Sequence, residues 1–376
     1  MRILLSIFRY FPTGGLQKDA LRIAMAACRA GHEVVFLTTR WEGEKPACPR
    51  LEIRLTPPLH AWSNMAKMAE FSRHVAQERS HGYDSELAMN RIPGAKFYFA
   101  GDECMAKAVS RKHCRLVRTL FPRYRALLAQ EKATLLSPET RKVLVISQRQ
   151  IQDFQEVYGL PAEHFVLLPP DMDGGSLPPP EESRRQELRR QERQDLGLSD
   201  DTILLLAVSS SFQLKGVDRA LLAMAHLPAE RRRQCHFVLI GRNDPAKFHA
   251  LAQKCGLSPE EITALPPRNS VGGLYLAADL MLHPARSEGA GSVLVEAIAN
   301  GLPVICTAVC GFAPIIAPAG NPVLAEPFNQ TELDQALLRS LETLPARKAA
   351  TRAFGDQNDF CGRAPFVVKL LEDKTP

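Results

Sequence analysis

The chain has 376 residues, of which 45% are hydrophobic and 23% are charged, and its formal net charge is +6. This length favours two domains, and the composition excludes a disordered or fibrous protein. Because no run of about 18 apolar residues is present, no transmembrane helix is expected. The opening residues are too short for a signal-peptide core, so we expect a cytoplasmic protein.

The nine cysteines are scattered along the chain. Cys306 and Cys310 are the nearest pair, but no second pair or histidine cluster completes a zinc set. We predict free, mostly buried thiols and no metal site.

The first elements form a strand–helix–strand unit. We predict a strand over residues 2–7, a helix over 16–30 with apolar residues at helical spacing, and a strand over 34–38. Such a unit implies a parallel sheet with its ligand edge at the carboxyl ends of the strands.

Gly14 and Gly15 lie between the first strand and the helix. A nicotinamide fold would show G-x-G-x-x-G here and an acid at the end of the second strand, and both are missing. The two glycines either bring backbone N–H groups to a diphosphate or sugar, or form a tight turn. Asp19, expected in the first helical turn, either complements the helix dipole or contacts a sugar hydroxyl.

Asp102 follows an apolar run in the first half of the chain. It is either a helix N-cap or a group that orients or deprotonates an acceptor hydroxyl.

The segment 105–132 is basic and amphipathic, with Glu131 as its single acid and Pro122 as an expected break. An anionic membrane attracts each such cation by about 1 kcal/mol. Nucleic acid is the competing partner, but aromatics are few and no nucleic-acid motif is present. The remaining alternative is an ordinary helix packed on its own domain. The predicted membrane-docking residues are Lys107, Arg111, Lys112, Arg115, Arg118, Arg123 and Arg125.

A hinge is expected near residues 168–175, where prolines and glycines interrupt regular structure. Pro178–Pro180 follows, and the mixed-charge run 181–195 predicts a solvated helix.

Strands and helices alternate again after residue 200. We predict strands over 202–208, 236–240, 280–283 and 303–307, with a helix from about Val217. The chain therefore reads as two doubly wound α/β halves facing a cleft. Arg268 is expected to start a further helix, where its guanidinium stacks on a base or is simply an ordinary loop arginine.

Lys215 lies in the loop after the first strand of the second half. A cation there can neutralise charge that builds up on a leaving diphosphate; the alternative is an exposed surface lysine. His283 ends a predicted strand and is either a buried structural histidine or a site residue.

Glu288 and Glu296 lie eight positions apart, with Gly289, Ala290 and Gly291 after the first. A helix is predicted to begin at residue 291 or 292 and to end before Gly301. The small residues expose N–H groups at the positive helix end to a phosphate, while the carboxylates can accept from hydroxyls. Nucleotide sugars carry both groups; a solvated helix face with an ordinary turn is the alternative.

Five blocks of sequence, 10–19, 39–43, 98–102, 215–219 and 282–296, resemble the lipopolysaccharide core glucosyltransferase family, and the similarity covers nearly the whole chain. The E-x₇-E element in the last block is shared by the wider group of family-4 retaining glycosyltransferases. This resemblance implies a GT-B fold without a bound metal or cofactor. It also implies transfer of glucose from UDP-glucose to a heptose of the lipid-linked core, with retention, by a peripheral protein on the inner membrane face.

The resemblance also assigns residue roles. Glu296 would hold the ribose, Glu288 the donor sugar, Lys215 the diphosphate and Arg268 the uracil. Amides at Gly14, Gly15 and Gly289–Gly291 would meet sugar and phosphate, and Asp19 and Asp102 would face the sugars. The catalytic residues would be Asp19, Asp102, Lys215 and Glu288. The expected domains are 1–172 and 173–354, with 355–376 returning to the first.

Leu214 stands where the family usually has arginine. One cation that would bind a phosphate is therefore missing, and the affinity for the donor and its identity stay open. The Pro178–Pro180 region and the run after it also differ from the family. Another UDP-sugar donor or acceptor, a nucleotide-sugar epimerase or phosphorylase, and a non-catalytic membrane scaffold remain as alternative functions.

Overall fold

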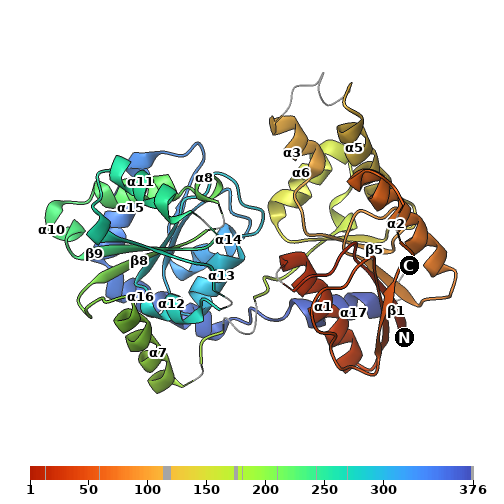
Figure 1. The fold of residues 1–376 in the computed structure, drawn as a ribbon, viewed down its shortest axis with the longest axis horizontal. Helices are drawn as coiled ribbons and strands as arrows, with labels where there is room; N and C mark the ends of the chain where they lie inside the picture. The colour runs from red at the N-terminus through yellow and green to blue at the C-terminus, as the bar shows by residue number, and fades with distance from the viewer. Residues whose placement is uncertain are drawn as a thin grey trace. The chain divides into compact units, whose positions relative to one another are not determined.

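The computed structural model describes residues 1–12, 14–58, 60–112, 120–172, 177–179, 181–209, 211–242, 244–268 and 270–373. The chain divides into two compact units, 1–169 with 362–376 and 170–361. The sequence placed these boundaries at 172 and 354. Both units are drawn in Figure 1, and each is described by itself below.

The N-terminal unit contains a seven-stranded parallel sheet in the order β3-β2-β1-β4-β5-β6-β7. The order reverses between β1 and β4, which is the switch point where doubly wound sheets bind ligands. The strands are β1 Arg2–Ser6, β2 Glu33–Thr38, β3 Leu51–Leu55, β4 Ser85–Ala88, β5 Phe97–Ala100, β6 Lys142–Val145 and β7 Phe165–Leu167.

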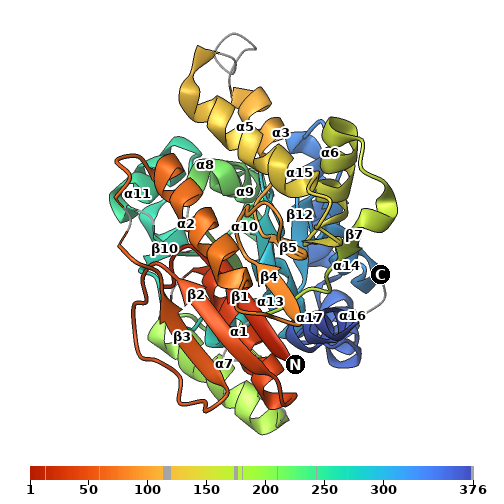
Figure 2. The same cartoon turned by 90° about the vertical axis from the view of Figure 1, so that its right-hand side faces the viewer.

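Helices cover both faces of this sheet, because Ile3 and Leu5 of β1 enter one hydrophobic cluster and Leu4 another. The last helix, α17, packs beside α1 in both ribbon views (Figures 1 and 2). Val367 of α17 and Ile23 of α1 share a cluster, which ties the end of the chain to the N-terminal unit. The helices are α1 Gly15–Arg29, α2 Asn64–Arg79, α3 Met105–Lys112, α5 Pro122–Leu135, α6 Gln148–Tyr158, η1 Ala162–His164 and α17 Arg363–Glu372.

The C-terminal unit contains a six-stranded parallel sheet in the order β10-β9-β8-β11-β12-β13, with its switch point between β8 and β11. Leu204 and Leu206 of β8 face one cluster while Leu205 and Ala207 face another, so this sheet is also buried on both sides. The strands are β8 Ile203–Val208, β9 Cys235–Ile240, β10 Ile262–Leu265, β11 Leu280–His283, β12 Val304–Thr307 and β13 Val323–Leu324.

The helices of this unit connect and flank the strands. They are α7 Glu182–Asp195, α8 Phe212–Lys215, α9 Val217–Ala225, α10 Ala229–Arg232, α11 Pro245–Lys254, η3 Pro259–Glu261, α12 Gly272–Ala277, α13 Ser292–Ala299, α14 Ala313–Ile316, η4 Ala317–Ala319, α15 Gln330–Glu342 and α16 Leu344–Gln357.

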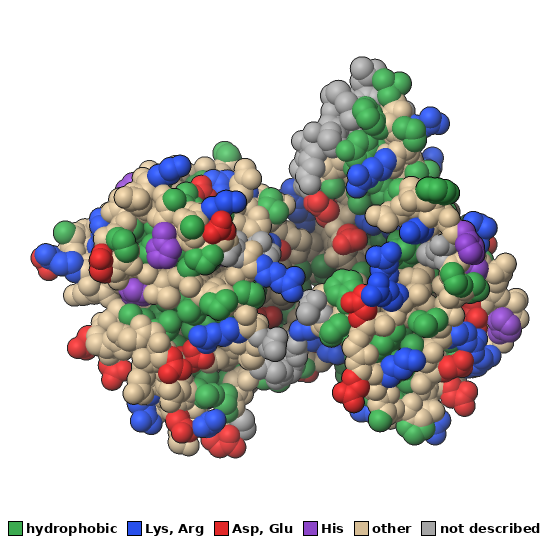
Figure 3. Space-filling model, in the orientation of Figure 1, with side chains coloured by type: hydrophobic (Ala, Val, Ile, Leu, Met, Phe, Trp, Pro, Cys, Tyr) green, Lys and Arg blue, Asp and Glu red, His purple; other side chains and the backbone are tan. Residues whose placement is uncertain are grey.

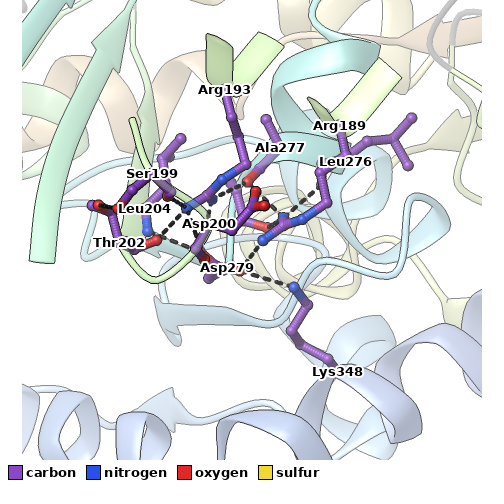
Figure 4. Close-up of polar contacts among 11 residues, drawn as sticks. Arg189, Arg193, Ser199, Asp200, Thr202, Leu204, Leu276, Ala277, Asp279 and Lys348 are labelled. Atoms are coloured by element: carbon purple, nitrogen blue, oxygen red, sulfur yellow. Dashed lines mark hydrogen bonds and ion pairs between the residues drawn. The ribbon is translucent and has the colours of Figure 1, made fainter. Parts of the chain in front are cut away.

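Helix α7 is the mixed-charge run, and the prediction of a solvated helix is confirmed for most of its residues but not for the face that carries Arg193. Arg193 is only 1% exposed, and together with Arg189 and Lys348 it binds the buried carboxylate of Asp279 at 3.2, 2.8 and 2.9 Å (Figure 4). Asp279 also accepts from the backbone N–H of Leu204 at 2.9 Å. We call this group the Asp279 cluster. It attaches α7 to the start of β11, because separating the helix from Asp279 would leave buried charges unpaired.

The basic segment forms helices α3 and α5, with Pro122 at the first position of α5. Glu131 is fully buried and accepts from the N–H groups of Met105 and Ala106 at 2.7 and 3.0 Å. Glu131 therefore satisfies these N–H groups at the N-terminus of α3, and of the two alternatives for Asp102 the N-cap is wrong.

Candidate functional site

The candidate site lies at the switch point of the C-terminal sheet, where β8 and β11 end. Short α8 follows β8, and Gly216 then turns the chain into α9 with a left-handed φ of 65°. A Cβ added at Gly216 would lie 2.0 Å from the carbonyl oxygen of Pro284, just after β11. The close approach of these two loops therefore requires glycine.

Backbone hydrogen bonds hold the same two loops together. The Leu214 carbonyl accepts from the N–H groups of Arg286 and Ser287 at 2.8 and 3.2 Å. Arg286 also binds Asp218 of α9 through two contacts of 2.6 Å. The Leu214 side chain itself is 50% exposed. The Arg286–Asp218 pair was not predicted, because no local spacing links residues 68 positions apart.

Lys215 and Glu288 meet at this point. The Lys215 Nζ lies 2.5 Å from Glu288 Oε2, and the two side chains are 19% and 13% exposed. The alternative of Lys215 as an exposed surface lysine is therefore wrong. His283 Nε2 lies 3.1 Å from the same oxygen, while Glu288 Oε1 accepts from the Gly289 N–H at 3.1 Å. Burial raises the pKa of Glu288, but His283 and Lys215 lower it more, to about 2, so the carboxylate stays ionised.

The small residues after Glu288 lead into α13 as predicted. Gly291 has a left-handed φ of 88° and precedes the first helical residue, Ser292, while Gly301 has a φ of 73° just after the helix. A Cβ added at Gly289 would meet no atom within 4 Å, so the backbone is open there. Open backbone beside a helix N-terminus suits an anionic ligand.

Glu296 lies on α13, where its Oε2 accepts from the Tyr275 hydroxyl of α12 at 2.9 Å. Tyr275 is 1% exposed, and burial together with the Glu296 charge raises its pKa well above 10.0. Tyr275 fixes the second glutamate of the motif. Sequence reasoning missed it, although a tyrosine in an otherwise small apolar helix was a usable signal.

Arg268 does not start a helix, since α12 begins at Gly272. Its guanidinium binds Glu192 of α7 at 2.8 Å and keeps 34% of its side chain exposed. The structure thus leaves the predicted contact of Arg268 with a base untested.

In the N-terminal unit, Gly14 precedes α1 and Gly15 is its first residue, with no atom within 4 Å of a Cβ added at Gly15. Asp19 lies beyond the first turn, which contains no acid, so the helix-dipole explanation is wrong. Its carboxylate binds Arg22 at 2.6 Å and Arg363 of α17 at 3.2 Å.

Asp102 follows β5 with its side chain 66% exposed, 3.5 Å from Arg91. Arg91 also binds Glu131 at 3.2 Å, so it joins Asp102 to the buried acid that caps α3.

The predicted membrane-docking residues are only partly described. Lys107 pairs with Glu156 at 2.5 Å, whereas Arg123 and Arg125 are exposed beside the apolar side chains of Leu120 and Phe121. Figure 3 shows hydrophobic and basic side chains side by side in this region. Arg115 and Arg118 lie outside the described residues, and only the backbone of Arg111 and Lys112 is described.

Neither a membrane-spanning helix nor a group of metal ligands is found among the described residues. No helix there combines the length and the apolar character needed to cross a bilayer. In the same ranges, no three His, Cys, Asp or Glu side chains are grouped as metal ligands, and the eight described cysteines are free.

The sequence of the chain is similar to that of known glycosyltransferases. Residues 189–353, which contain Lys215, Glu288 and Glu296, match the family model described as glycosyl transferases group 1. The chain is 38% identical to the lipopolysaccharide glucosyltransferase WaaG of Escherichia coli K12 over 364 residues, covering 96% of this chain and 95% of that protein.

Solved structures give the same result for the fold. The chain matches the crystal structure of WaaG, a glycosyltransferase involved in lipopolysaccharide biosynthesis, with a TM-score of 0.83, 36% identity, and coverage of 98% and 99% of the two chains. Anabaena HepE in complex with UDP-glucose is 18% identical with a TM-score of 0.70, over 99% and 98% of the chains, and shares the fold. Each unit thus has the parallel α/β sheet expected of a GT-B protein, and the chain belongs to the lipopolysaccharide glucosyltransferase family that includes WaaG.

Proposed function

We propose that this glycosyltransferase moves glucose from UDP-glucose to a heptose of the lipopolysaccharide core, with retention at the anomeric carbon. The observation that carries the proposal is the Lys215–Glu288 pair at the switch point of the C-terminal sheet, beside open backbone at Gly289. UDP-glucose is the nucleotide sugar in the HepE complex, which supports the choice of donor. Relatedness to WaaG supports the acceptor class.

In this proposal the donor binds with its diphosphate near Lys215 and the amides of Gly289–Gly291, and its sugar near Glu288. Glu296, oriented by Tyr275, takes the ribose hydroxyls, and Arg268 approaches the uracil. The Lys215 side chain is only 19% exposed, so in this proposal its ammonium acts on the leaving diphosphate with little screening by water.

We propose a reaction without a bound metal or other cofactor. The leaving diphosphate accepts the proton of the acceptor hydroxyl on the same face of the sugar, so no side chain forms a covalent bond. Lys215 and the helix amides stabilise the charge that develops on that diphosphate. Gly14, Gly15, Asp19 and Asp102 are proposed to face the sugars.

The decisive test measures UDP release from UDP-glucose with and without the lipid-linked core acceptor. We expect release only with acceptor, and competition by UDP-galactose and the N-acetyl forms defines the donor. Donor conversion without acceptor would indicate an epimerase, and a requirement for free phosphate would indicate a phosphorylase. If calorimetry detects no UDP binding, the non-catalytic membrane scaffold is the remaining function.

We further propose peripheral binding to an anionic membrane on the cytoplasmic side through the segment 105–132. Exposed Arg123 and Arg125 beside exposed Leu120 and Phe121 combine charge with apolar contact. The double variant Arg123→Glu/Arg125→Glu should lose flotation with anionic vesicles. The charge-matched double variant Arg141→Glu/Arg149→Glu, exposed on the same unit, should keep it. Equal binding of the wild type to neutral and anionic vesicles would contradict the electrostatic account.

A further inference from the structure

His283 is a buried imidazole that the proposed reaction does not use directly. It ends β11 with 1% exposure, and its Nε2 lies 3.1 Å from Glu288 Oε2. A buried polar ring needs partners for its nitrogens, because an unpaired polar group in the core is costly. One partner is therefore Glu288, on the ligand side.

The other side of the ring faces the neighbouring strand β12. In the parallel register His283 lies opposite Cys306, and Cys310 follows in the turn after β12, where its Sγ lies 3.9 Å from the Thr307 hydroxyl and interacts with both His283 and Cys306. Thr307 holds this turn in place: its carbonyl accepts from the Cys310 N–H at 3.1 Å, and its hydroxyl donates to the Ala285 carbonyl at 2.7 Å. The imidazole is thus held between a thiol and a carboxylate.

We propose that His283 and Cys310 are positioning residues that hold the Glu288 carboxylate in place for the donor sugar. This inference rests on the proposed role of Glu288 in binding that sugar. Both Lys215 and His283 contact Oε2 of Glu288, whereas Oε1 lies against the Gly289 N–H. When Lys215 turns toward a diphosphate, His283 remains as the cation that keeps Glu288 ionised and fixed.

The directions of the pKa shifts of His283 and Cys310 agree with this arrangement. Burial lowers the pKa of His283, but Cys310 and Glu288 outweigh it and raise that pKa to about 9. The hydrogen bond with Cys306, opposed by burial and aided by His283, lowers the pKa of Cys310. The groups facing His283 are Glu288 and Lys215 from the site side and Cys306 and Cys310 from the β12 side, while nearby Arg219 donates to the Pro284 carbonyl.

The first experiment is a proton NMR titration of His283 in the full-length protein, assigned with His283→Asn. We expect the ring to stay protonated at neutral pH and to titrate well above its ordinary value of 6.5. Cys310→Ala and Glu288→Gln should each move the titration back toward that value. A titration at the ordinary value in the wild type overturns the proposal without needing any folded variant.

The second experiment separates donor-sugar binding from nucleotide binding. Cys310→Ala should raise the KM for UDP-glucose roughly fivefold, the size of one lost hydrogen bond, while UDP affinity changes less than about twofold. Cys310→Ser, which keeps a hydrogen-bonding group, should recover part of the loss. Cys235→Ala, another buried thiol on β9 of the same unit, is the matched control. Equal KM values for the Cys310 and Cys235 variants overturn the proposal.

The two proposals fail in different ways. If UDP does not bind, or Glu288→Gln is fully active, the proposed function fails. The titration still decides whether His283 is held charged between Cys310 and Glu288. If UDP binds and Glu288→Gln is inactive while His283 titrates ordinarily, only the positioning role fails.

Discussion

Two carboxylates flank the four-residue strand β11, and their surroundings differ. Asp279, just before the strand, binds Arg189, Arg193 and Lys348 and accepts from the Leu204 N–H. Glu288, shortly after the strand, meets Lys215, His283 and the Gly289 N–H.

The two edges of this one sheet therefore use the same chemical group differently. At the amino edge Arg189 and Arg193 also bind the carbonyl oxygens that end α12, so the Asp279 cluster is closed by the fold itself. At the carboxyl edge Glu288 lies beside open backbone at Gly289. The first arrangement is closed within the unit, whereas the second leaves main-chain groups accessible at the carboxyl edge, where open α/β sheets generally bind ligands.

The largest expected effect comes from breaking the Asp279 cluster. Asp279→Ala leaves two arginines and a lysine without their shared carboxylate, and should lower the free energy of unfolding by about 3–5 kcal/mol. Urea denaturation measures this loss. The exposed neighbour Asp201→Ala should change stability by less than about 0.5 kcal/mol. Similar losses of unfolding free energy in the two variants would contradict a stabilising role of the Asp279 cluster.

The opposite edge should respond in activity. Lys215→Ala and Glu288→Gln should each reduce turnover by roughly 10²-fold or more, the scale of losing one preorganised electrostatic group, and urea denaturation measures the loss of stability that accompanies removal of one partner of a buried pair. The exposed Lys254→Ala on α11 is the control for charge removal. Full activity of both site variants would refute their assignment.

The contact between the loops of the site depends on Gly216. Gly216→Ala strains a left-handed residue and forces a Cβ against the Pro284 carbonyl, and should destabilise the unit by about 1–3 kcal/mol. Gly256→Ala has a φ of 85° but open space around it, so it measures the backbone strain alone. The difference between the urea denaturation midpoints of the two variants gives the part of the destabilisation that is due to the steric clash. Equal midpoints would show that the two loops can separate at little cost.

The Asp279 cluster should also show in the pH dependence of stability. Burial raises the pKa of Asp279, but Lys348 and Arg189 lower it more, so the folded value lies below the ordinary 3.8. The stabilisation by the Asp279 carboxylate is complete above the ordinary pKa of 3.8 and is lost as the pH falls through the lower pKa of the folded state. The stability gap between wild type and Asp279→Asn should therefore be constant near neutral pH and shrink in acid. A gap that widens in acid would have the wrong sign.

The smallest effect is expected at Arg268. Its partly exposed pair with Glu192 should contribute less than about 1 kcal/mol to stability. If the guanidinium stacks on uracil, Arg268→Ala should weaken UDP binding about two- to fivefold, as measured by calorimetry. Unchanged affinity would remove Arg268 from the donor site.

Elements with a strong local signal were predictable from sequence. The strand at 280–283 is a largely apolar run that ends before Pro284, and α13 lies between Gly291 and Gly301, which adopt left-handed backbone. Strands that are buried on both faces appear in the sequence as unbroken hydrophobic runs, so they can be located without knowing which strand they pair with.

Contacts between distant residues were not predictable. Arg193 and Asp279 are 86 positions apart, so an arginine-rich helix looked solvated although one face is anchored in the unit. Glu131 caps α3 from 26 residues away, and Arg268 looked like a helix start because two prolines precede it. Each error arose because tertiary partners, absent from any local window, decided the role of a polar side chain.

The Leu214 carbonyl, which receives two main-chain N–H groups from the loop after β11, has a consequence for how this family can diversify. Both hydrogen bonds are made by main-chain atoms, so holding the two loops together does not depend on which side chain stands at position 214. A different side chain at position 214 would keep both main-chain hydrogen bonds, so variation there can leave the loop that carries Glu288 in place.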